Sequence, residues 1–600
     1  MTSYCENPYA HCRRVTREVM IGPVGVGGAN PIRVQSMITC DTMDTGASIA
    51  QTIELAAAGC EIVRITAPTV KDSANLEHIV RGLRERGCAV PIVADIHFKP
   101  EAAMEAAKWV EKVRINPGNY ADSKKFKIVE YTDEQYAAEL ERIRERFTPL
   151  VRLCRERGIA MRIGTNHGSL SDRIMNRYGD TPLGMVESAL EFARIARELD
   201  YHAFVFSMKS SNPKVMINAY RLLVARLDEQ GDDWNYPIHL GVTEAGEGED
   251  ARIKSAIGIG SLLHDGIGDT IRVSLTEDSV HEIPVARALV EIGNRIAETG
   301  KAEVGAAPVS YNPFEYERRG SSKIERGGVK LGGDELIRVV VRQTSFDKVA
   351  HKLDRMGDYQ PEIVYEKAGV VEIDPRDEAA IERINESAEA QLVTVGDEIG
   401  LNVIPAFRLL AAKLHPRHPV LLKDVLGNRK PETENRKEKE SDFLETLLMA
   451  ATNIGSLLCD GIGDAILVQG EEAPGQALRL SYNILQAAGS RIFKTDYVAC
   501  PSCGRTLFNL QTTTARIKAA TSHLKGVKIA IMGCIVNGPG EMADADFGYV
   551  GGAPGKVNLY VGKTAVKFNI PEADAVERLQ DLIREHDKWV EPAGAAPVLV

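Results

Sequence analysis

Short apolar runs alternate with amphipathic segments from about residue 30 to residue 300. The runs are rich in β-branched residues, and between them apolar residues recur with the i, i+3, i+4 spacing of a helix. Strands that alternate with helices of this length predict right-handed βαβ units and a parallel sheet. The eight predicted strands are IRVQSM from Ile32, EIVRIT from Glu61, PIVADIH from Pro91, KVRIN from Lys112, AMRIGTN from Ala160, AFVFSMKSS from Ala203, IHLGVTEAG from Ile238 and TIRVSLT from Thr270.

Eight such units in about 250 residues match the size of a TIM (β/α)8 barrel. We therefore predict an α/β fold that begins with a TIM barrel over residues 1–300. An open doubly wound sheet has the same local pattern and remains an alternative. A charged helix predicted over residues 133–157 would either cover the active site or form a solvated excursion. The other predicted helices are 49–58, 73–87, 100–109, 184–199 and 282–298.

Polar residues stand at the ends of the predicted strands, where the chemistry of a TIM barrel is located. Buried Arg and Lys side chains need anionic partners, so several at one barrel mouth predict a phosphate or diphosphate ligand. The alternative is a rim network in which these cations pair with Asp95, Glu244 or Asp269. The strand-end residues are Arg64, Asp95, His97, Arg114, Asn116, Arg162, Asn166, Lys209, Ser210, Glu244, Arg272 and Ser274.

A repeated sequence marks another part of the chain. Residues 260–271 read GSLLHDGIGDTI and residues 455–466 read GSLLCDGIGDAI, which agree at ten of twelve positions. A match of this length indicates duplication of part of the barrel. Leu467 stands in the second copy where Arg272 stands in the first, so the second copy lacks that cation. We expect a barrel-like scaffold without an active site of its own.

These features predict the remaining domain boundaries. A linker is expected over residues 301–330, the barrel-like insert over residues 331–480, and a cysteine-containing α/β domain over residues 481–600.

Three cysteines and a glutamate cluster in the last part of the chain. ACPSCGRT supplies Cys500 and Cys503, and MGCIVNGPGE supplies Cys534 and Glu541. Two cysteines at this spacing can bind one metal or cluster from a single turn. A thioredoxin-like pair or a structural zinc is the alternative, although the sequence after Cys503 does not resemble a thioredoxin helix and a fourth Cys or His is absent near Cys534. Three thiolates and a carboxylate suit a 4Fe–4S cluster with one exchangeable iron, whereas Glu541 could instead be an exposed loop residue.

Composition limits the class of protein. With 44% apolar, 26% charged and 6% aromatic residues, the 600-residue chain is typical of a multidomain soluble enzyme. A net charge of −11 argues against a nucleic-acid partner. Neither a signal peptide nor a membrane span is expected, and the seven scattered cysteines suit a reducing cytoplasm.

Taken together, the motifs resemble those of (E)-4-hydroxy-3-methylbut-2-enyl diphosphate synthases, in their long three-domain form. The resemblance extends over nearly the whole chain, and YNPFEYERRG (311–320) with the insert resembles the long form specifically. The motifs are QSM (35–37), VADIHF (93–98), VRINPGN (113–119), MRIGTNHGSLSDR (161–173), TEAG (243–246), DGIGDTIRVSLT (265–276), CPSCGR (500–505) and GCIVNGPGE (533–541).

The resemblance implies a barrel, a barrel-like insert and a C-terminal domain similar to sulfite reductase. It also implies reductive ring opening and dehydration of 2-C-methyl-D-erythritol 2,4-cyclodiphosphate in the non-mevalonate isoprenoid pathway, with ferredoxin or flavodoxin as the electron donor. The implied cluster ligands are Cys500, Cys503, Cys534 and Glu541. The implied substrate-binding residues are Arg64, Arg114, Arg162, Asn166, Lys209, Arg272 and Ser274, and Asp95, Glu244 and Glu541 are implied in catalysis.

Two other functions remain open at this stage. One is a non-redox barrel transferase that binds a pterin or phosphate and carries a structural zinc. The other is a non-catalytic regulator derived from the enzyme, which fits poorly with the survival of both half-sites. The sequence is compatible with a monomer or a homodimer.

Overall fold

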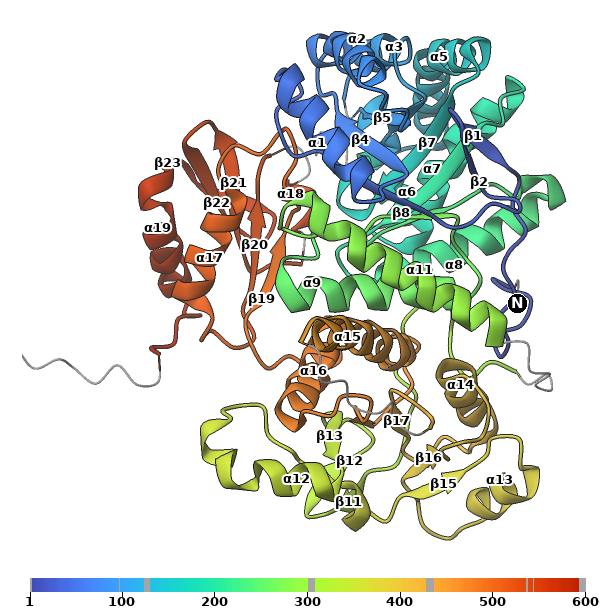
Figure 1. Cartoon of the computed structure of the whole chain (residues 1–600), viewed down its shortest axis with the longest axis vertical. Coiled ribbons are helices and arrows are strands. Elements are labelled where there is room, and N and C mark those ends of the chain that lie inside the picture. The colour runs from blue at the N-terminus through green and yellow to red at the C-terminus, as the bar shows by residue number, and fades with distance from the viewer. Residues whose placement is uncertain are drawn as a thin grey trace, which may run out of the picture.

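The computed structural model describes residues 3–96, 98–122, 130–299, 308–427, 436–535, 538–542 and 544–592. It has three parts, which Figure 1 shows as a barrel in blue to green, an insert in yellow to orange and a C-terminal domain in orange to red. The insert lies against one side of the barrel, and the C-terminal domain lies beside the barrel's end.

The first part is a parallel eight-stranded barrel. Its hydrogen-bonded order is β8-β7-β6-β5-β4-β3-β10-β9, and a parallel bridge between Phe206 and Ile238 joins the two end strands. The predicted TIM barrel is confirmed, and the open doubly wound alternative is wrong. The strands are β3 (Arg33–Met37), β4 (Ile62–Thr66), β5 (Ile92–Asp95), β6 (Lys112–Ile115), β7 (Ala160–Asn166), β8 (Phe204–Lys209), β9 (His239–Leu240) and β10 (Thr270–Ile271).

Helices surround the barrel. The charged helix predicted over residues 133–157 is α5 (Asp133–Arg157), and it packs against α3 and α7 in the outer ring rather than over the mouth of the barrel. Phe147 of α5 makes an edge-to-face contact with Phe192 of α7, with ring centroids 4.9 Å apart. The other helices are α1 (Thr45–Ala57), α2 (Val70–Glu85), α3 (Pro100–Ala106), α4 (Pro117–Tyr120), α6 (Asp172–Tyr178), α7 (Pro182–Glu198), α8 (Pro213–Gln230), α9 (Gly248–Ser255), α10 (Ser261–His264) and α11 (Glu282–Thr299).

A hairpin that the sequence analysis did not predict closes the amino end of the barrel. It consists of β1 (Val19–Ile21) and β2 (Val24–Val26), which pair antiparallel. Apolar side chains are buried at that end, which leaves the carboxyl end of the strands as the side where we look for a ligand site. The apolar cluster contains Val19, Ile21, Val26, Ile62, Val93, Ala160 and Val205.

The insert is a smaller relative of the barrel. Six parallel strands run in the order β15-β16-β17-β18-β13-β14, with an isolated bridge between Val393 and Val420 joining β16 to β17. The predicted barrel-like insert is thereby confirmed. Its strands are β13 (Arg338–Val341), β14 (Ile363–Val364), β15 (Val371–Ile373), β16 (Val393–Val395), β17 (Leu421–Lys423) and β18 (Ala465–Leu467), and its helices are α12 (Gln343–Val349), α13 (Glu378–Asn385), α14 (Val403–Lys413), α15 (Arg436–Cys459) and α16 (Pro474–Ala487).

The duplication extends beyond the twelve-residue repeat. The hairpin β11 (Ile324–Arg326) and β12 (Val329–Leu331) begins in the stretch predicted as a linker and packs on the insert as β1–β2 packs on the barrel. An arginine before each hairpin binds the final aspartate of the repeat at the same distance. Arg13 lies 3.3 Å from Asp269, and Arg318 lies 3.3 Å from Asp464.

The two copies face each other through equivalent residues. Ser261 hydrogen bonds Ser456, its equivalent at an offset of 195 residues. A Cβ atom on Gly260 would lie 2.3 Å from Thr452, and one on the equivalent Gly455 would lie 2.3 Å from Ile257. Such reciprocal contacts are typical of a two-fold interface between identical subunits. The insert therefore occupies the position that a second barrel would take in a symmetric dimer.

Four charged side chains form the centre of this interface. Arg221 binds Asp265 at 2.8 Å and Asp460 at 2.7 Å, while Arg408 binds Asp265 at 2.7 Å and Asp460 at 2.9 Å. All four side chains are at most 1% exposed. Each arginine binds one aspartate from each copy, so the network fixes the insert on the barrel.

The C-terminal domain is a five-stranded mixed sheet in the order β19-β20-β21-β22-β23. Helices α17 and α19 pack together on it around one apolar cluster. Its similarity to sulfite reductase remains a prediction. The elements are β19 (Asp496–Ala499), β20 (Lys528–Met532), β21 (Phe547–Ala553), β22 (Lys556–Val561), β23 (Thr564–Pro571), α17 (Leu510–Thr521), α18 (Gly538–Glu541) and α19 (Glu572–Glu585).

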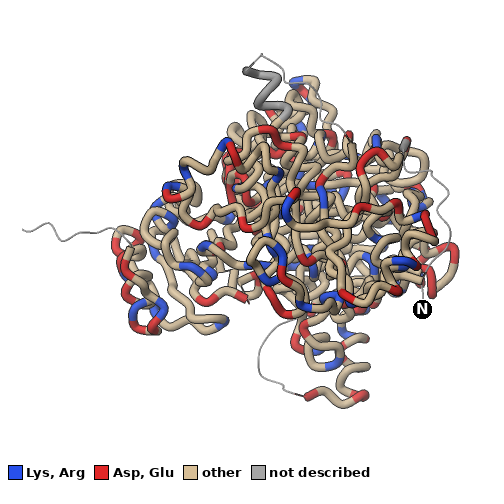
Figure 2. The backbone as a smooth tube through the Cα atoms, turned by 90° about the horizontal axis from the view of Figure 1, so that it is seen from below, with Lys and Arg blue, Asp and Glu red and all other residues tan. Residues whose placement is uncertain are grey.

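Two further features concern the chain as a whole. Among the described helices, none is both long enough and apolar enough to span a membrane. Basic and acidic residues are interspersed along the chain in Figure 2 rather than separated by sign.

Replacing Arg408 by Met should destabilise the junction between barrel and insert. The change leaves two buried aspartates with one arginine, and breaking a buried pair in this way costs about 3–5 kcal/mol. The measurement is the midpoint of the first urea-induced unfolding transition. Glu445→Gln is the matched control, because Glu445 pairs with Arg295 at 2.6 Å across the same interface but is 35% exposed. This control should lose at most about 1 kcal/mol. Equal small losses in both variants would show that the junction does not depend on its buried ion pairs.

Candidate active site

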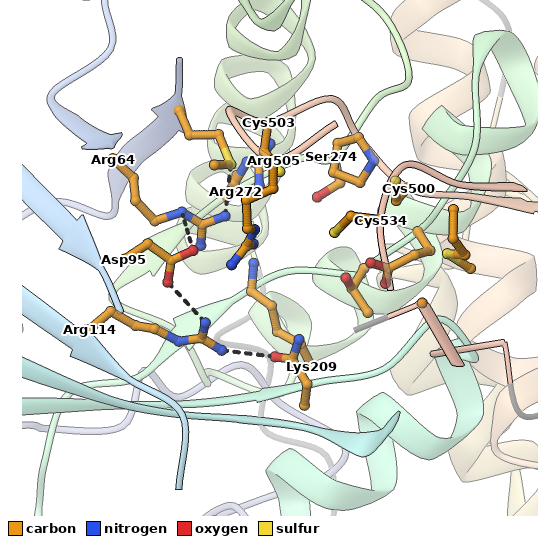
Figure 3. A pocket seen from close by; sticks show the side chains of 17 residues that line it. Arg64, Asp95, Arg114, Lys209, Arg272, Ser274, Cys500, Cys503, Arg505 and Cys534 are labelled. Atoms are coloured by element: carbon orange, nitrogen blue, oxygen red, sulfur yellow. Dashed lines mark hydrogen bonds and ion pairs between the residues drawn. The ribbon is translucent and has the colours of Figure 1, made fainter. Parts of the chain in front are cut away.

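A cavity lies between the carboxyl end of the barrel and the C-terminal domain (Figure 3). It contains side chains that the barrel strands direct towards their carboxyl ends. The sequence-predicted residues on its wall are Arg64, Asp95, Arg114, Asn166, Lys209, Glu244, Arg272, Ser274, Cys500, Cys503 and Cys534.

Asp95 orients the arginines on two neighbouring strands. Its carboxylate accepts a hydrogen bond of 2.9 Å from Arg114 and lies 3.8 Å from Nε of Arg64. Arg114 also donates to the Asn166 side chain at 3.2 Å. One carboxylate therefore holds two guanidinium groups in place and neutralises only part of their charge.

Lys209 reaches the cavity from the end of β8. A Cβ atom on Gly241 of the next strand would lie 2.8 Å from its Nζ, so the glycine provides the space that the ammonium group occupies. Burial lowers the pKa of Lys209, and the nearby positive charges of Arg64 and Arg162 lower it further. The ammonium group thus lies among like charges in the absence of a ligand.

A carboxylate behind the wall of the cavity holds Arg272. Glu282 at the start of α11 accepts hydrogen bonds of 3.1 Å and 2.9 Å from Arg272 and one of 2.6 Å from Ser36. Arg114 and Arg64 thus pair with Asp95, as the rim-network alternative expects. Arg272 pairs instead with Glu282, which that alternative did not name, and no ion pair is found for Lys209 among the described residues.

Arg162 lies below the cavity wall. Its side chain is fully buried, and its Nε and Nη1 have no hydrogen-bond partner in the described structure. Lys112 and His239 are also fully buried; burial lowers the pKa of each, and the positive charge of Arg162 lowers it further. The barrel interior at this level is polar and cationic, whereas most TIM barrels are filled by branched apolar residues.

Some strand-end residues lie elsewhere. Asn116 donates a 2.7 Å hydrogen bond to Ser169, and Ser210 accepts one of 3.2 Å from the backbone of Asn212. Neither lies on the cavity wall. His97 lies outside the described residues.

The three cysteines enter the cavity from two strand ends of the C-terminal domain. Cys500 follows β19, and its sulfur accepts a 3.2 Å hydrogen bond from the backbone N–H of Gly533, next to Cys534 after β20. Burial raises the pKa of the Cys500 thiol, and the neighbouring Cys503 raises it further. None of the three forms a disulfide with another described cysteine.

Two carboxyl groups meet beside the thiols. Glu541 at the end of α18 is 5% exposed and contacts Glu244 and Asn166 from the barrel. Burial raises the pKa of both carboxyl groups, and the negative charge of Glu244 raises that of Glu541 further. Oε1 of Glu541 and Oε2 of Glu244 have no hydrogen-bond partner in the described structure. The exposed-loop alternative for Glu541 is wrong.

The C-terminal domain docks on the barrel of the same chain. A Cβ atom on Gly168 would lie 2.2 Å from the backbone of Gly540, so the two backbones touch where η1 (His167–Ser169) meets α18. On the other side, Thr276 donates a 3.1 Å hydrogen bond to the carbonyl of Cys500. These contacts place both half-sites of one chain around a single cavity.

The sequence analysis missed Arg505. Its side chain comes from the C-terminal domain and lines the cavity beside Arg64 and Arg272 (Figure 3). Burial by itself lowers the pKa of Arg505, but the negative charges of Cys503 and Asp95 outweigh this effect and raise it. Its position two residues after the Cys-x-x-Cys motif was the available signal, since a side chain so near Cys503 in sequence can reach the thiols.

At the equivalent end of the insert, a buried positive charge is neutralised by carboxylates of the insert itself. Arg272 is replaced by Leu467 as predicted, but Lys423 at the end of β17 supplies a buried cation. It pairs with Asp397 at 3.1 Å and Glu372 at 3.5 Å. Lys423 therefore has carboxylate partners, which supports the prediction that the insert is a scaffold.

Comparison with known proteins agrees with this architecture. The GcpE TIM-barrel domain matches residues 16–287, and the GcpE protein C-terminal domain matches residues 496–585. The insert lies between the two matches.

Relatives cover the full chain. A protein of Akkermansia muciniphila named 4-hydroxy-3-methylbut-2-en-1-yl diphosphate synthase (flavodoxin) is 59% identical over 98% of this chain and 100% of its own length. A Leptospira interrogans protein of the same name is 46% identical over 98% and 99%. The Arabidopsis thaliana protein named as the ferredoxin form, chloroplastic, is 41% identical over 99% and 90%. The chain therefore belongs to the GcpE family, whose members include these 4-hydroxy-3-methylbut-2-en-1-yl diphosphate synthases.

Proposed function

We propose that the protein opens and reductively dehydrates 2-C-methyl-D-erythritol 2,4-cyclodiphosphate to (E)-4-hydroxy-3-methylbut-2-enyl diphosphate, with electrons from flavodoxin or ferredoxin. In this reaction two electrons and two protons enter and one water molecule leaves. The observation that carries the proposal is the cavity in which cations of the barrel face three thiols of the C-terminal domain, while Glu541 is buried beside it against Glu244.

The cysteines and Glu541 have the chemistry of ligands for an iron–sulfur cluster. The thiols are not in disulfides, and Oε1 of Glu541 is a buried acceptor without a partner in the described structure. We assign Cys500, Cys503 and Cys534 as thiolate ligands of one 4Fe–4S cluster and Glu541 as an exchangeable oxygen ligand. When bound, such a cluster supplies single electrons and a Lewis-acidic iron.

A structural zinc, as in the non-redox transferase alternative, is less consistent with these positions. Within the described residues, no three His, Cys, Asp or Glu side chains are gathered as the ligands of one metal ion are. Thiols that share a cavity without converging on one point suit a multi-iron cluster better. The family relationship likewise does not favour the transferase.

The barrel cations bind the diphosphate. Ring opening leaves a linear diphosphate with more negative charge, and preorganised cations lower the energy of such charge as it develops. Arg64 and Arg114, which Asp95 orients, and Lys209 would contact the phosphoryl oxygens directly. Arg162 lies beneath them and adds positive potential from below.

Glu244 is placed to manage a proton. Its unpartnered Oε2 lies at the cavity wall beside Glu541, between the cations and the thiols. A carboxyl group at this place can hold a proton at Oε2 and give it to the oxygen that leaves as water. Asn166, which contacts both Arg114 and Glu541, would keep the two half-sites aligned.

Anaerobic turnover tests the function. The purified enzyme with a chemical reductant should convert the cyclic diphosphate into a linear one, followed by phosphorus NMR. Cys534→Ser should abolish both turnover and the cluster absorbance near about 400 nm, because a serine oxygen is a poor ligand for the cluster. Cys88→Ser is the matched control, since Cys88 is similarly half-buried but lies away from the cavity. A colourless wild-type protein that leaves the substrate unchanged would refute the function.

Replacing Lys209 by Met should weaken substrate affinity. The loss of a hydrogen bond to a charged group is worth about 1.5–3 kcal/mol, or about a ten- to one-hundred-fold rise in KM. Lys423→Met removes a buried lysine at the equivalent end of the insert and should leave KM unchanged. The cluster spectrum should be normal in both variants. An unchanged KM in Lys209→Met would remove that residue from the binding site.

Mixing two inactive chains tests docking within one chain. Arg114→Ala is impaired at the barrel and Cys534→Ser at the cluster, while each retains the other half-site. If the C-terminal domain serves its own barrel, as the contact between Gly168 and Gly540 places it, the mixture should remain inactive. Activity recovered on mixing would mean that half-sites from different chains combine.

A further inference from the structure

Arg505 occupies an unusual place for a residue of the cluster-binding loop. The backbone N–H of Thr506 donates a 2.9 Å hydrogen bond to the carbonyl of Cys503, so Arg505 lies inside a four-residue turn. A Cβ atom on Gly504 would lie 2.8 Å from the carbonyl of Cys40, which shows that the turn is pressed against the barrel. The turn therefore carries the Arg505 side chain across the domain boundary.

The guanidinium of Arg505 lacks a carboxylate partner. Among the described residues, no Asp or Glu lies within ion-pair distance of it, and its buried Nε and Nη1 have no hydrogen-bond partner. The nearest barrel carboxylate, Asp95, already binds Arg114 and contacts Arg64. An arginine cannot lose its charge by deprotonation. Cys503 contacts the Arg505 guanidinium, but Nε and Nη1 have no acceptor among the described residues, so two donors remain for an anion in the cavity.

Three guanidinium groups then meet in one place. Arg64 and Arg272 come from the barrel and Arg505 from the C-terminal domain, and Figure 3 shows them together on one side of the cavity. Buried like charges repel, so docking without a ligand places an unfavourable third cation beside two others. A bound diphosphate replaces this repulsion by attraction, because its oxygens can accept two parallel hydrogen bonds from one guanidinium group.

We infer that Arg505 is a diphosphate-binding residue supplied by the C-terminal domain, and that it couples substrate binding to docking of that domain on the barrel. This inference rests on the proposed function. The coupling is reciprocal: a substrate that binds better to the docked form favours docking, and docking strengthens substrate binding. Arg505 is thus a binding and positioning residue that acts only when both half-sites are together.

The test compares Arg505→Gln with Arg516→Gln, both as cluster-loaded proteins. Arg516 is an exposed cation on α17 of the same domain, so its replacement removes the same charge away from the cavity. Calorimetric titration with the cyclic diphosphate should show a rise in Kd of about ten- to one-hundred-fold for Arg505→Gln only. Hydrogen exchange over residues 165–171, which include the Gly168 contact, should slow on substrate addition in wild type and Arg516→Gln but not in Arg505→Gln.

The outcomes separate the inference from the proposed function. A wild-type protein that neither binds nor converts the cyclic diphosphate refutes the function itself. A functional wild type with an Arg505→Gln variant of normal Kd and normal substrate-induced protection overturns the inference alone.

Loss of the cluster absorbance in Arg505→Gln with unchanged affinity also overturns the inference, since Arg505 would then serve the thiolates. If the cluster and the affinity are lost together, Arg505→Lys decides, because it keeps a cation beside Cys503 but lacks the paired donors. The inference expects restored absorbance with a Kd still several-fold above wild type. Full recovery of both would contradict it.

Discussion

Uncompensated positive charge in a closed cavity is the constraint on which the arrangement of the active site depends. The barrel buries Arg64, Arg114 and Lys209 at the carboxyl end of its strands, and the carboxylate of Asp95 offsets part of their charge. Solvation of buried cations by water is lost, so the site is stable only with an anion or with incomplete closure. The protein thereby has an electrostatic preference for an anion such as a diphosphate, and Arg505 of the C-terminal domain contributes to this preference.

The periodic pattern of the barrel was sufficient to predict all eight of its strands. Each strand is buried on both faces, which makes the apolar run nearly continuous and easy to recognise. The hairpins escaped prediction because each strand has only three residues and gains its stability from packing on the barrel. The position of α5 was also undecided, since a charged helix can cover a site or a barrel wall, and only its contacts with α3 and α7 distinguish these cases.

Sequence reasoning could anticipate which residues lie together where the strand order itself gathers them. Strand ends such as Arg64 and Ser274 reach one cavity because parallel strands share an edge, and a short motif places Cys500 and Cys503 together. Sequence reasoning did not show how deeply a side chain is buried, or which contacts form between domains. The pattern could not show that Arg162 lies below the wall, nor that Arg505 crosses from another domain, because both depend on packing between segments far apart in the chain.

The pairing of the two copies within one chain has an evolutionary consequence. In a symmetric homodimer each substitution at the interface appears twice, so a change that suits one side is imposed on the other. Here the halves are encoded separately, and the repeat already differs at His264 and Cys459 while Asp265 and Asp460 agree. One copy can therefore lose its active-site residues and keep a structural role. The insert is an example, because its buried Lys423 is neutralised by carboxylates of the same copy. Because the two copies lie in one chain, each can take a role of its own that identical subunits could not.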